Sequence, residues 1–199
     1  MEHSPIDKLI NDISKLPGLG RRSAQRIALF LLKDKNKNLS PLIKSLDLAN
    51  NKIIECSNCG NIDMQNPCNI CNNTKRDVNT ICVVEDVSDL WTFEKMGIYK
   101  GLYNVLGGSL SALQGIGTDE LKIQKLIDRV EKTNVKEIIL ALSTTMEGQT
   151  TSFLIADKLE KFKDLKVTRL AQGITIGGEV HYLDENTLNT AFQSRKSVS

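Results

Sequence analysis

The chain has 199 residues, of which 40% are hydrophobic and 25% are charged, as is typical of a folded globular protein. This composition excludes a disordered chain, and the apolar runs are far too short to form a membrane-spanning helix. The formal net charge of +2 does not by itself indicate a nucleic-acid-binding protein. Residues 1–55 carry ten Lys or Arg against six Asp or Glu, so the basic excess lies in the N-terminal part, where it suits a phosphate-binding surface or simply a solvated face.

The first residues show no secretory signal, because Met1-Glu2-His3-Ser4-Pro5 leads directly into a helical pattern without an apolar stretch and cleavage site. We therefore expect a cytoplasmic, nucleoid-associated protein with no membrane attachment. Four of the five cysteines crowd into sixteen residues, which argues against a secreted disulfide framework and favours a metal site. The fifth, Cys82, lies in an apolar strand pattern and is predicted to be a buried, unreactive thiol.

Residues 6–33 predict a short helical hairpin. Apolar residues recur at helical spacing from Ile6 to Leu16, Pro17-Gly18-Leu19-Gly20 breaks the helix, and a second helix runs from about Ser23 to Lys33. The amides at the start of a helix bind phosphate, nearby arginines add positive charge, and neither reads base edges, so the hairpin predicts sequence-independent DNA binding. An ordinary helix-helix turn with surface arginines would look the same locally. The candidate DNA contacts are Gly18, Gly20, Arg21, Arg22 and Arg26.

A polar loop at residues 34–38 and a third helix, capped by Ser40 with Pro41 at its first position, lead to the cysteine cluster. The spacing Cys56-x2-Cys59-x8-Cys68-x2-Cys71 forms two knuckles whose four thiolates close one tetrahedral zinc site. Four sulfur ligands leave no open position for water or substrate, so we predict a structural zinc rather than a catalytic zinc or a redox dithiol. An iron-sulfur cluster is the nearest alternative.

From residue 79 onward, apolar strands alternate with amphipathic helices, which predicts a mostly parallel sheet covered by helices. The expected strands are 80–85, 103–106, 136–142 and 166–170, and the expected helices are 88–96, 119–132 and 147–162. A strand at 179–184 and a helix at 187–194 are expected to end the chain. The glycine-rich segment 107–117 is equally consistent with a flexible connection and a functional loop.

The first of these strands delivers Glu85 and Asp86 at its carboxyl end, the edge at which open α/β sheets bind ligands. This half of the chain resembles Toprim domains, in which a glutamate at this position works with a later Asp-x-Asp pair to hold magnesium. Here the later strand is followed by Ser143-Thr144-Thr145, so two-metal chemistry lacks its ligands, although weak magnesium binding by Glu85 remains open. Thr144-x-x-Glu147 fits a capping box.

Four segments together resemble the RecR family of recombination mediators over nearly the whole chain. They are residues 16–26, the four-cysteine knuckle, residues 81–86 with 103–108, and residues 171–178 with 182–184. The resemblance implies a non-catalytic DNA clamp, a homo-oligomer forming a dimer or a tetrameric ring, that acts with RecO and RecF to load RecA onto gapped DNA coated with single-strand-binding protein. It assigns DNA contact to Arg22 and Arg26, and contact with RecO to Glu147 beside Glu85 and Asp86.

The predicted fold class is therefore α/β: a Toprim-like, mostly parallel sheet with flanking helices, preceded by an all-α helix-hairpin-helix module and a small four-cysteine zinc knuckle. We expect the hairpin module at residues 1–54, the zinc finger at 55–78, the Toprim-like domain at 79–173 and a subunit-pairing C-terminal extension at 174–199. The chain departs from the family pattern at Ser143-Thr144, Gln172 and Thr175, which bears on the partner surface and leaves the zinc and hairpin predictions intact.

Two other functions compete with this interpretation. A Toprim-type enzyme such as a primase, topoisomerase or nuclease would need metal ligands that the sequence lacks, and no nucleophile stands in a recognisable motif. A zinc-stapled interaction module would never contact DNA, and substitution of Arg22 and Arg26 would then leave its binding unchanged.

Overall fold

The computed structural model describes residues 4–195, so the ends of the predicted N-terminal module and C-terminal extension, residues 1–3 and 196–199, lie outside the described residues. The chain divides into two compact units, one up to Ile54 and one from Glu55 onward. Within the described residues, no helix combines the length and the apolarity that crossing a membrane requires.

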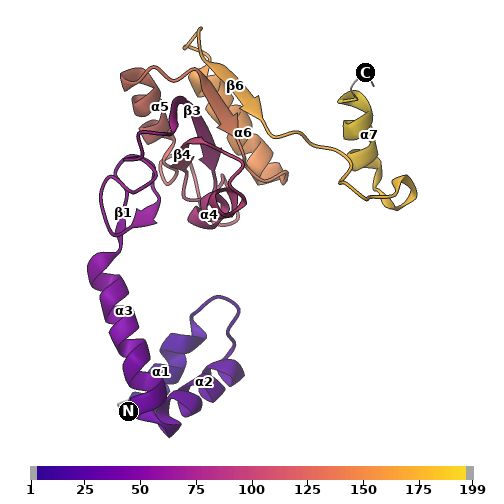
Figure 1. Ribbon diagram of the computed structural model, residues 1–199. Coiled ribbons are helices and arrows are strands. Elements are labelled where there is room, and N and C mark those ends of the chain that lie inside the picture. The colour runs from indigo at the N-terminus through magenta and orange to yellow at the C-terminus, as the bar shows by residue number, and fades with distance from the viewer. Residues whose placement is uncertain (1–3, 196–199) are drawn as a thin grey trace. The chain divides into compact units, whose positions relative to one another are not determined.

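The N-terminal unit is a helical hairpin followed by a third helix (Figure 1). Helices α1 (Pro5–Ser14) and α2 (Arg21–Lys33) pack together, and α2 supplies the buried Ala24 and Ala28, whose small side chains allow close approach. Helix α3 spans Ser40–Lys52.

Two local expectations for this unit are wrong. The predicted loop at 34–38 contains a π-helical turn, η1 (Lys35–Leu39), because the Asp34 side chain accepts the Lys37 amide and so caps the turn. Ser40 does not cap α3: it is already helical, Leu39 occupies the N-cap position, and no side chain caps this helix end.

The C-terminal unit contains a four-stranded sheet whose strands are all parallel, in the order β4-β3-β5-β6. The strands span Asp77–Val84 (β3), Gly101–Val105 (β4), Glu137–Leu140 (β5) and Lys166–Arg169 (β6). In the register, Ile81 lies opposite Leu102 on one side and Ile138 on the other. The structure thus confirms the parallel Toprim-like sheet.

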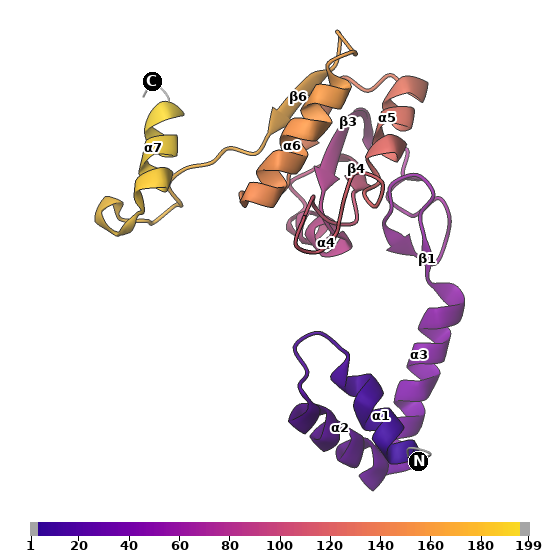
Figure 2. The same cartoon turned by 180° about the vertical axis from the view of Figure 1, so that it is seen from behind.

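Helices cover both faces of this sheet (Figures 1 and 2). Helix α4 (Val87–Met96) packs against one face, and α5 (Ile123–Lys132) and α6 (Met146–Leu159) pack against the other. Side chains of β3 alternate between the two cores, with Val83 on the α5 and α6 side and Cys82 and Val84 on the α4 side. Cys82 is 3% exposed, which confirms its predicted burial.

The strand order reverses between β3 and β5, because the chain leaves β3 towards β4 and later returns to the opposite side of β3. The crevice at the carboxyl ends of two such strands is where open α/β sheets bind ligands. Glu85 directly follows β3, and Ser143 follows β5 by three residues. The fold therefore places the predicted carboxylate edge at this switch point.

The predicted strand at 179–184 is wrong: the segment contains a 3-10 turn, η2 (Val180–Tyr182). Its amides bond locally, from Tyr182 to the Glu179 carbonyl and from Leu183 to the Val180 carbonyl, so no neighbouring strand is needed. Helix α7 (Glu185–Gln193) follows and is capped by Asp184. The segment 107–117 is a loop with one antiparallel bridge, Ser111 to Ile116.

Candidate metal centre and nucleic-acid interface

The structure brings the four predicted metal ligands together in the knuckle formed around β1 (Ile54–Glu55) and β2 (Ile62–Asp63). All four sulfur atoms lie within 4.8 Å of one another, with 3.9 Å between Cys56 and Cys71 and 3.6 Å between Cys59 and Cys68. Zinc-sulfur bonds of about 2.3 Å at tetrahedral angles place sulfurs about 3.8 Å apart. The four thiols therefore fit a tetrahedral metal ion.

Backbone amides point at the sulfur atoms, as a negatively charged thiolate cluster requires. The Cys68 amide lies 3.3 Å from the Cys56 sulfur, and the Asn61 amide lies 3.5 Å from the Cys59 sulfur. Burial opposes ionisation of Cys56, but amide donors outweigh it and lower its pKa to about 7. Burial raises the pKa of Cys68 to about 11. A bound zinc would act structurally, by holding the four thiolates and joining the two knuckles.

The knuckle docks on the free edge of strand β4. The Val105 amide donates to the Cys59 carbonyl at 2.7 Å, which continues the ladder of this edge strand. Glu55 pairs with Lys122 at 2.6 Å, and this bond holds the pKa of the Glu55 carboxyl below its ordinary value. Ile70 packs against both the cysteine cluster and the apolar core beneath α4. The zinc site and the sheet therefore form one packed body.

The hairpin has the geometry that the sequence predicted. Gly18 has φ of +76°, a left-handed conformation that favours glycine, and the Leu19 amide closes the turn on the Leu16 carbonyl at 3.1 Å. Gly20 occupies the N-cap position of α2 and has no side chain that could accept a hydrogen bond. No capping side chain therefore pairs with the first backbone amides of this helix. The candidate cations Arg21, Arg22 and Arg26 are all exposed on α2.

At the sheet edge, two of the three predicted partner-binding carboxylates are engaged within the chain. Glu85 accepts the Ser143 amide at 2.6 Å across the switch point, and this bond ties the ends of β3 and β5 together. Asp86 caps α4 by accepting the Ser88 amide at 3.0 Å, while Asp89 accepts the Asp86 amide in a reciprocal capping box.

The predicted capping box at Thr144-x-x-Glu147 is wrong by one residue. Thr145 is the N-cap of α6 and its hydroxyl accepts the Gly148 amide at 3.2 Å. The physical reason is that a cap accepts from the third helical residue, and that position belongs to Gly148 rather than to Glu147. Glu147 is therefore an exposed carboxylate in the first turn of α6, where the helix dipole favours its charge.

Sequence reasoning missed a partly buried polar network beneath α4. Arg76 donates to Glu94 and to the Gly101 carbonyl, and the fully buried Tyr103 donates to the other Glu94 oxygen at 2.8 Å. Burial and then the Glu94 carboxylate raise the Tyr103 pKa well above its ordinary value. Arg76 and Glu94 are 18 residues apart, so no local pattern links them.

Sequence reasoning also missed the contact between Asn61 of the knuckle and Trp91 of α4, which lie 30 residues apart. The chain has only one tryptophan and a polar residue directly after Gly60. These features draw attention to both positions, but only the folded structure shows that the two side chains meet.

Comparison with known families accounts for nearly the whole chain. Residues 6–49 match the helix-hairpin-helix model of RecR, and residues 53–73 match the model of its four-cysteine zinc finger domain. Residues 79–171 match a Toprim domain, and residues 173–196 match the RecR C-terminal model. A protein named recombination protein RecR from Mesorhizobium japonicum is 54% identical over 190 residues, which cover 96% of this chain and 94% of the relative.

The chain belongs to the RecR family. Further RecR proteins, from Erythrobacter litoralis and Rhizobium etli, are 46% and 50% identical; the alignments cover 100% and 97% of this chain and 100% and 96% of the relatives. The RecR zinc finger model includes all four clustered cysteines, so the metal is zinc rather than an iron-sulfur cluster. The order of hairpin, zinc finger and Toprim domain confirms the predicted RecR-like fold class.

Proposed function

We propose that this chain is a non-catalytic recombination mediator: a DNA clamp that acts with RecO and RecF to load RecA onto gapped DNA coated with single-strand-binding protein. The observation that carries the proposal is the hairpin, which presents uncapped helix amides and three exposed arginines at one point of the N-terminal unit. Amides and guanidinium groups bind the phosphate backbone without reading bases, as a protein that loads a recombinase at any gap requires.

The sheet edge supports a role without catalysis. A Toprim-type enzyme holds magnesium with carboxylates from two strand ends, but here the loop after β5 supplies Ser143, Thr144 and Thr145. The Glu85 carboxylate already accepts the Ser143 amide. Within the described residues, the knuckle is the only place where three or more side chains of the metal-binding types converge. The alternative, a metal-dependent nucleic-acid enzyme, therefore lacks its ligand set.

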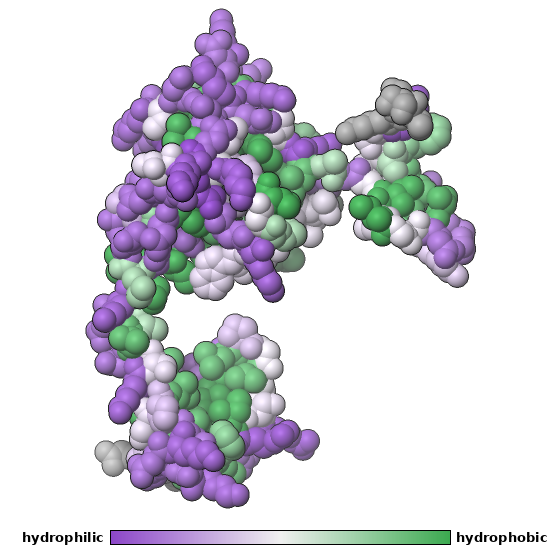
Figure 3. Space-filling view, in the orientation of Figure 1, coloured by the Kyte–Doolittle hydropathy of each residue, from purple (hydrophilic) through white to green (hydrophobic). Residues whose placement is uncertain are grey.

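Exposed apolar surfaces support self-association. The C-terminal extension, residues 174–195, leaves Tyr182 and Phe192 80% and 72% exposed, and Ile176 fully so. The N-terminal unit carries a second apolar patch, visible in Figure 3 as green atoms. The large apolar side chains that are exposed in this unit include Leu29, Phe30, Leu42, Ile43 and Leu46. Exposed apolar surface of this extent is typical of protein interfaces.

Two separate self-interfaces on one chain have a geometric consequence. One interface with two-fold symmetry gives a dimer, and a second one, at the other end of the chain, joins dimers into a larger assembly with an even number of subunits when it closes. This supports a dimer or a tetrameric ring that surrounds DNA. The mass of the protein in solution, measured by light scattering, tests the point. Phe192→Ser should halve the assembly, whereas Leu113→Ser, at an even more exposed apolar position, should leave it intact.

Glu147 is the carboxylate best placed to bind a partner such as RecO, because it is exposed while Glu85 and Asp86 are engaged within the chain. We expect Glu147→Gln to weaken binding of the cognate RecO by several-fold to tenfold. Glu160→Gln, which changes an exposed glutamate at the other end of α6, is the matched control. Equal RecO binding by both variants would contradict this assignment.

DNA binding tests the clamp proposal directly. On duplex DNA, log affinity falls with log salt concentration, and each lost phosphate contact makes this slope shallower by about 0.9. The double variant Arg22→Gln and Arg26→Gln should therefore lose affinity for gapped DNA at low salt and show a slope shallower by about 2. Lys158→Gln, an exposed lysine on α6, serves as the control. An unchanged slope would contradict the clamp and favour an interaction module that never contacts DNA.

A further inference from the structure

Helix α4 presents the only tryptophan of the chain on its outer face. Trp91 is 53% exposed, although the neighbouring Leu90 is fully buried in the core that α4 shares with β3 and β4. The core therefore does not require the large indole at this position. About half of the indole surface is therefore accessible to a ligand.

The indole is held in one orientation. Its Nε1-H donates to the Asn61 side-chain oxygen at 3.3 Å. Asn61 is only 4% exposed, and its backbone is bonded to the knuckle. Its backbone carbonyl accepts the Cys56 amide at 2.7 Å, and its backbone amide points at the Cys59 sulfur. The zinc knuckle thus fixes Asn61, and Asn61 fixes Trp91. Because the polar atom of the indole is already bonded, the apolar ring face is what remains to bind a ligand.

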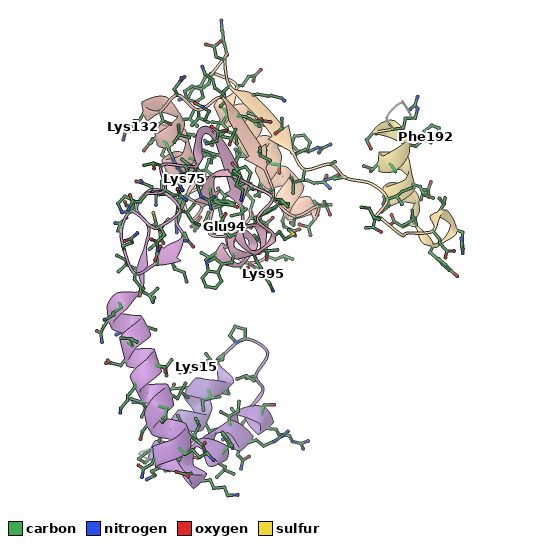
Figure 4. All side chains as sticks on the ribbon, in the orientation of Figure 1. Lys15, Lys75, Glu94, Lys95, Lys132 and Phe192 are labelled. Carbon is green, nitrogen blue, oxygen red and sulfur yellow. The ribbon has the colours of Figure 1, made fainter. Side chains whose placement is uncertain are left out.

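One turn from the indole, α4 carries a lysine that no carboxylate of the described residues neutralises. Asp86 and Asp89 are engaged in the capping box, and Glu94 is engaged by Arg76 and Tyr103 on the side of α4 that faces the sheet. Lys95 lies one turn beyond Trp91 on the outer side of the helix, and within the described residues it forms no ion pair (Figure 4). A rigid aromatic ring beside a free cation is the combination that binds single-stranded nucleic acid, with stacked bases and neutralised phosphate.

We propose that Trp91 and Lys95 form a base-stacking site for single-stranded DNA, with Asn61 as the residue that positions the indole. The proposal rests on the proposed function, since gapped DNA offers both duplex and single strand. It adds a contact in the C-terminal unit to the hairpin of the N-terminal unit. Stacking accepts any base, so this site preserves the lack of sequence preference.

The single tryptophan makes the test direct, because all tryptophan emission comes from Trp91. Full-length zinc-loaded protein is titrated with oligothymidylate at low salt, and stacking should quench the emission. Because Trp91→Ala and Trp91→Phe lack the emitting residue, the affinity of every variant is measured by the fluorescence anisotropy of dye-labelled oligothymidylate. In that assay Trp91→Ala should weaken single-strand affinity on the order of tenfold, and Trp91→Phe should retain most of it. Asn61→Ala should reduce both the affinity and the quenching of Trp91 emission. Leu113→Ala, at a side chain 97% exposed in the same unit, is the control.

The outcomes separate this site from the clamp itself. If Trp91→Ala keeps full single-strand affinity while the Arg22 and Arg26 double variant loses it, the stacking site is wrong and the clamp stands. If oligothymidylate causes no quenching at any concentration, the stacking site is also wrong. If Trp91→Ala impairs only the binding of a partner protein, the surface belongs to that protein. Zinc content and thermal unfolding confirm that each variant is folded. The variant Lys95→Gln tests the stacking site without changing the aromatic ring.

Discussion

Gly60 joins the zinc knuckle to the sheet, and its substitution by alanine tests that docking. Gly60 has φ of +78°, and an added Cβ would lie 3.1 Å from the Val105 carbonyl oxygen and 3.3 Å from the Val105 Cβ. The left-handed conformation costs alanine about 1 kcal/mol. Pressing a methyl group against the buried strand β4 adds about 2 kcal/mol. Gly60→Ala should therefore lower the free energy of unfolding of the C-terminal unit by about 3 kcal/mol.

Gly97 supplies the matched control, because it ends α4 with φ of +66° and an added Cβ there would meet no atom within 4 Å. Gly97→Ala should cost only the conformational part, about 1 kcal/mol. Urea unfolding followed by Trp91 fluorescence measures both variants in zinc-loaded protein, and the m-value confirms that the same transition is compared. Equal losses for the two variants would refute the docking of Gly60 against Val105.

Three further predictions concern the C-terminal unit. Gly148→Ala should lower its free energy of unfolding by about 3 kcal/mol, because an added Cβ would clash with the Ser143 carbonyl oxygen; a loss below about 1 kcal/mol in urea unfolding would contradict that packing. Tyr103→Phe should cost about 1 to 2 kcal/mol in the same assay, since it removes the hydroxyl that donates to Glu94, and a neutral result would mean that this bond contributes nothing. Burial raises the Cys82 pKa to about 12, so at pH 8 this thiol stays protonated and should resist iodoacetamide in folded, zinc-loaded protein. It should become reactive only as the pH approaches its pKa or the unit unfolds. Early alkylation of Cys82, detected by peptide mass spectrometry, would contradict its burial.

Most elements of the fold could be predicted from sequence patterns with a fixed spacing. The Cys-x-x-Cys pairs, the Pro17-Gly18-Leu19-Gly20 break and the alternation of strands and helices each depend on neighbours in the chain, and each led to the element that the structure contains. The zinc ligands could be predicted for the same reason, because two knuckles of this spacing converge in few ways.

The errors arose where bonds outside the pattern decide the outcome. Residues 179–184 read as a strand, but their amides bond within the segment to form η2. The cap of α6 shifted from Thr144 to Thr145 because the position of the helix start, rather than the residue type, selects the cap. The contact of Asn61 with Trp91 joins residues that are 30 positions apart, and only the docked knuckle brings them together.

We propose that the chain helps to load a recombinase without altering DNA. The most direct measurement follows RecA filament formation on labelled, gapped DNA coated with single-strand-binding protein, with this protein, its cognate RecO and magnesium present. We expect faster loading on DNA that stays intact, and loss of that acceleration with the Arg22→Gln and Arg26→Gln double variant. Cut or extended DNA, or a double variant that accelerates loading as well as the wild-type protein does, would contradict it.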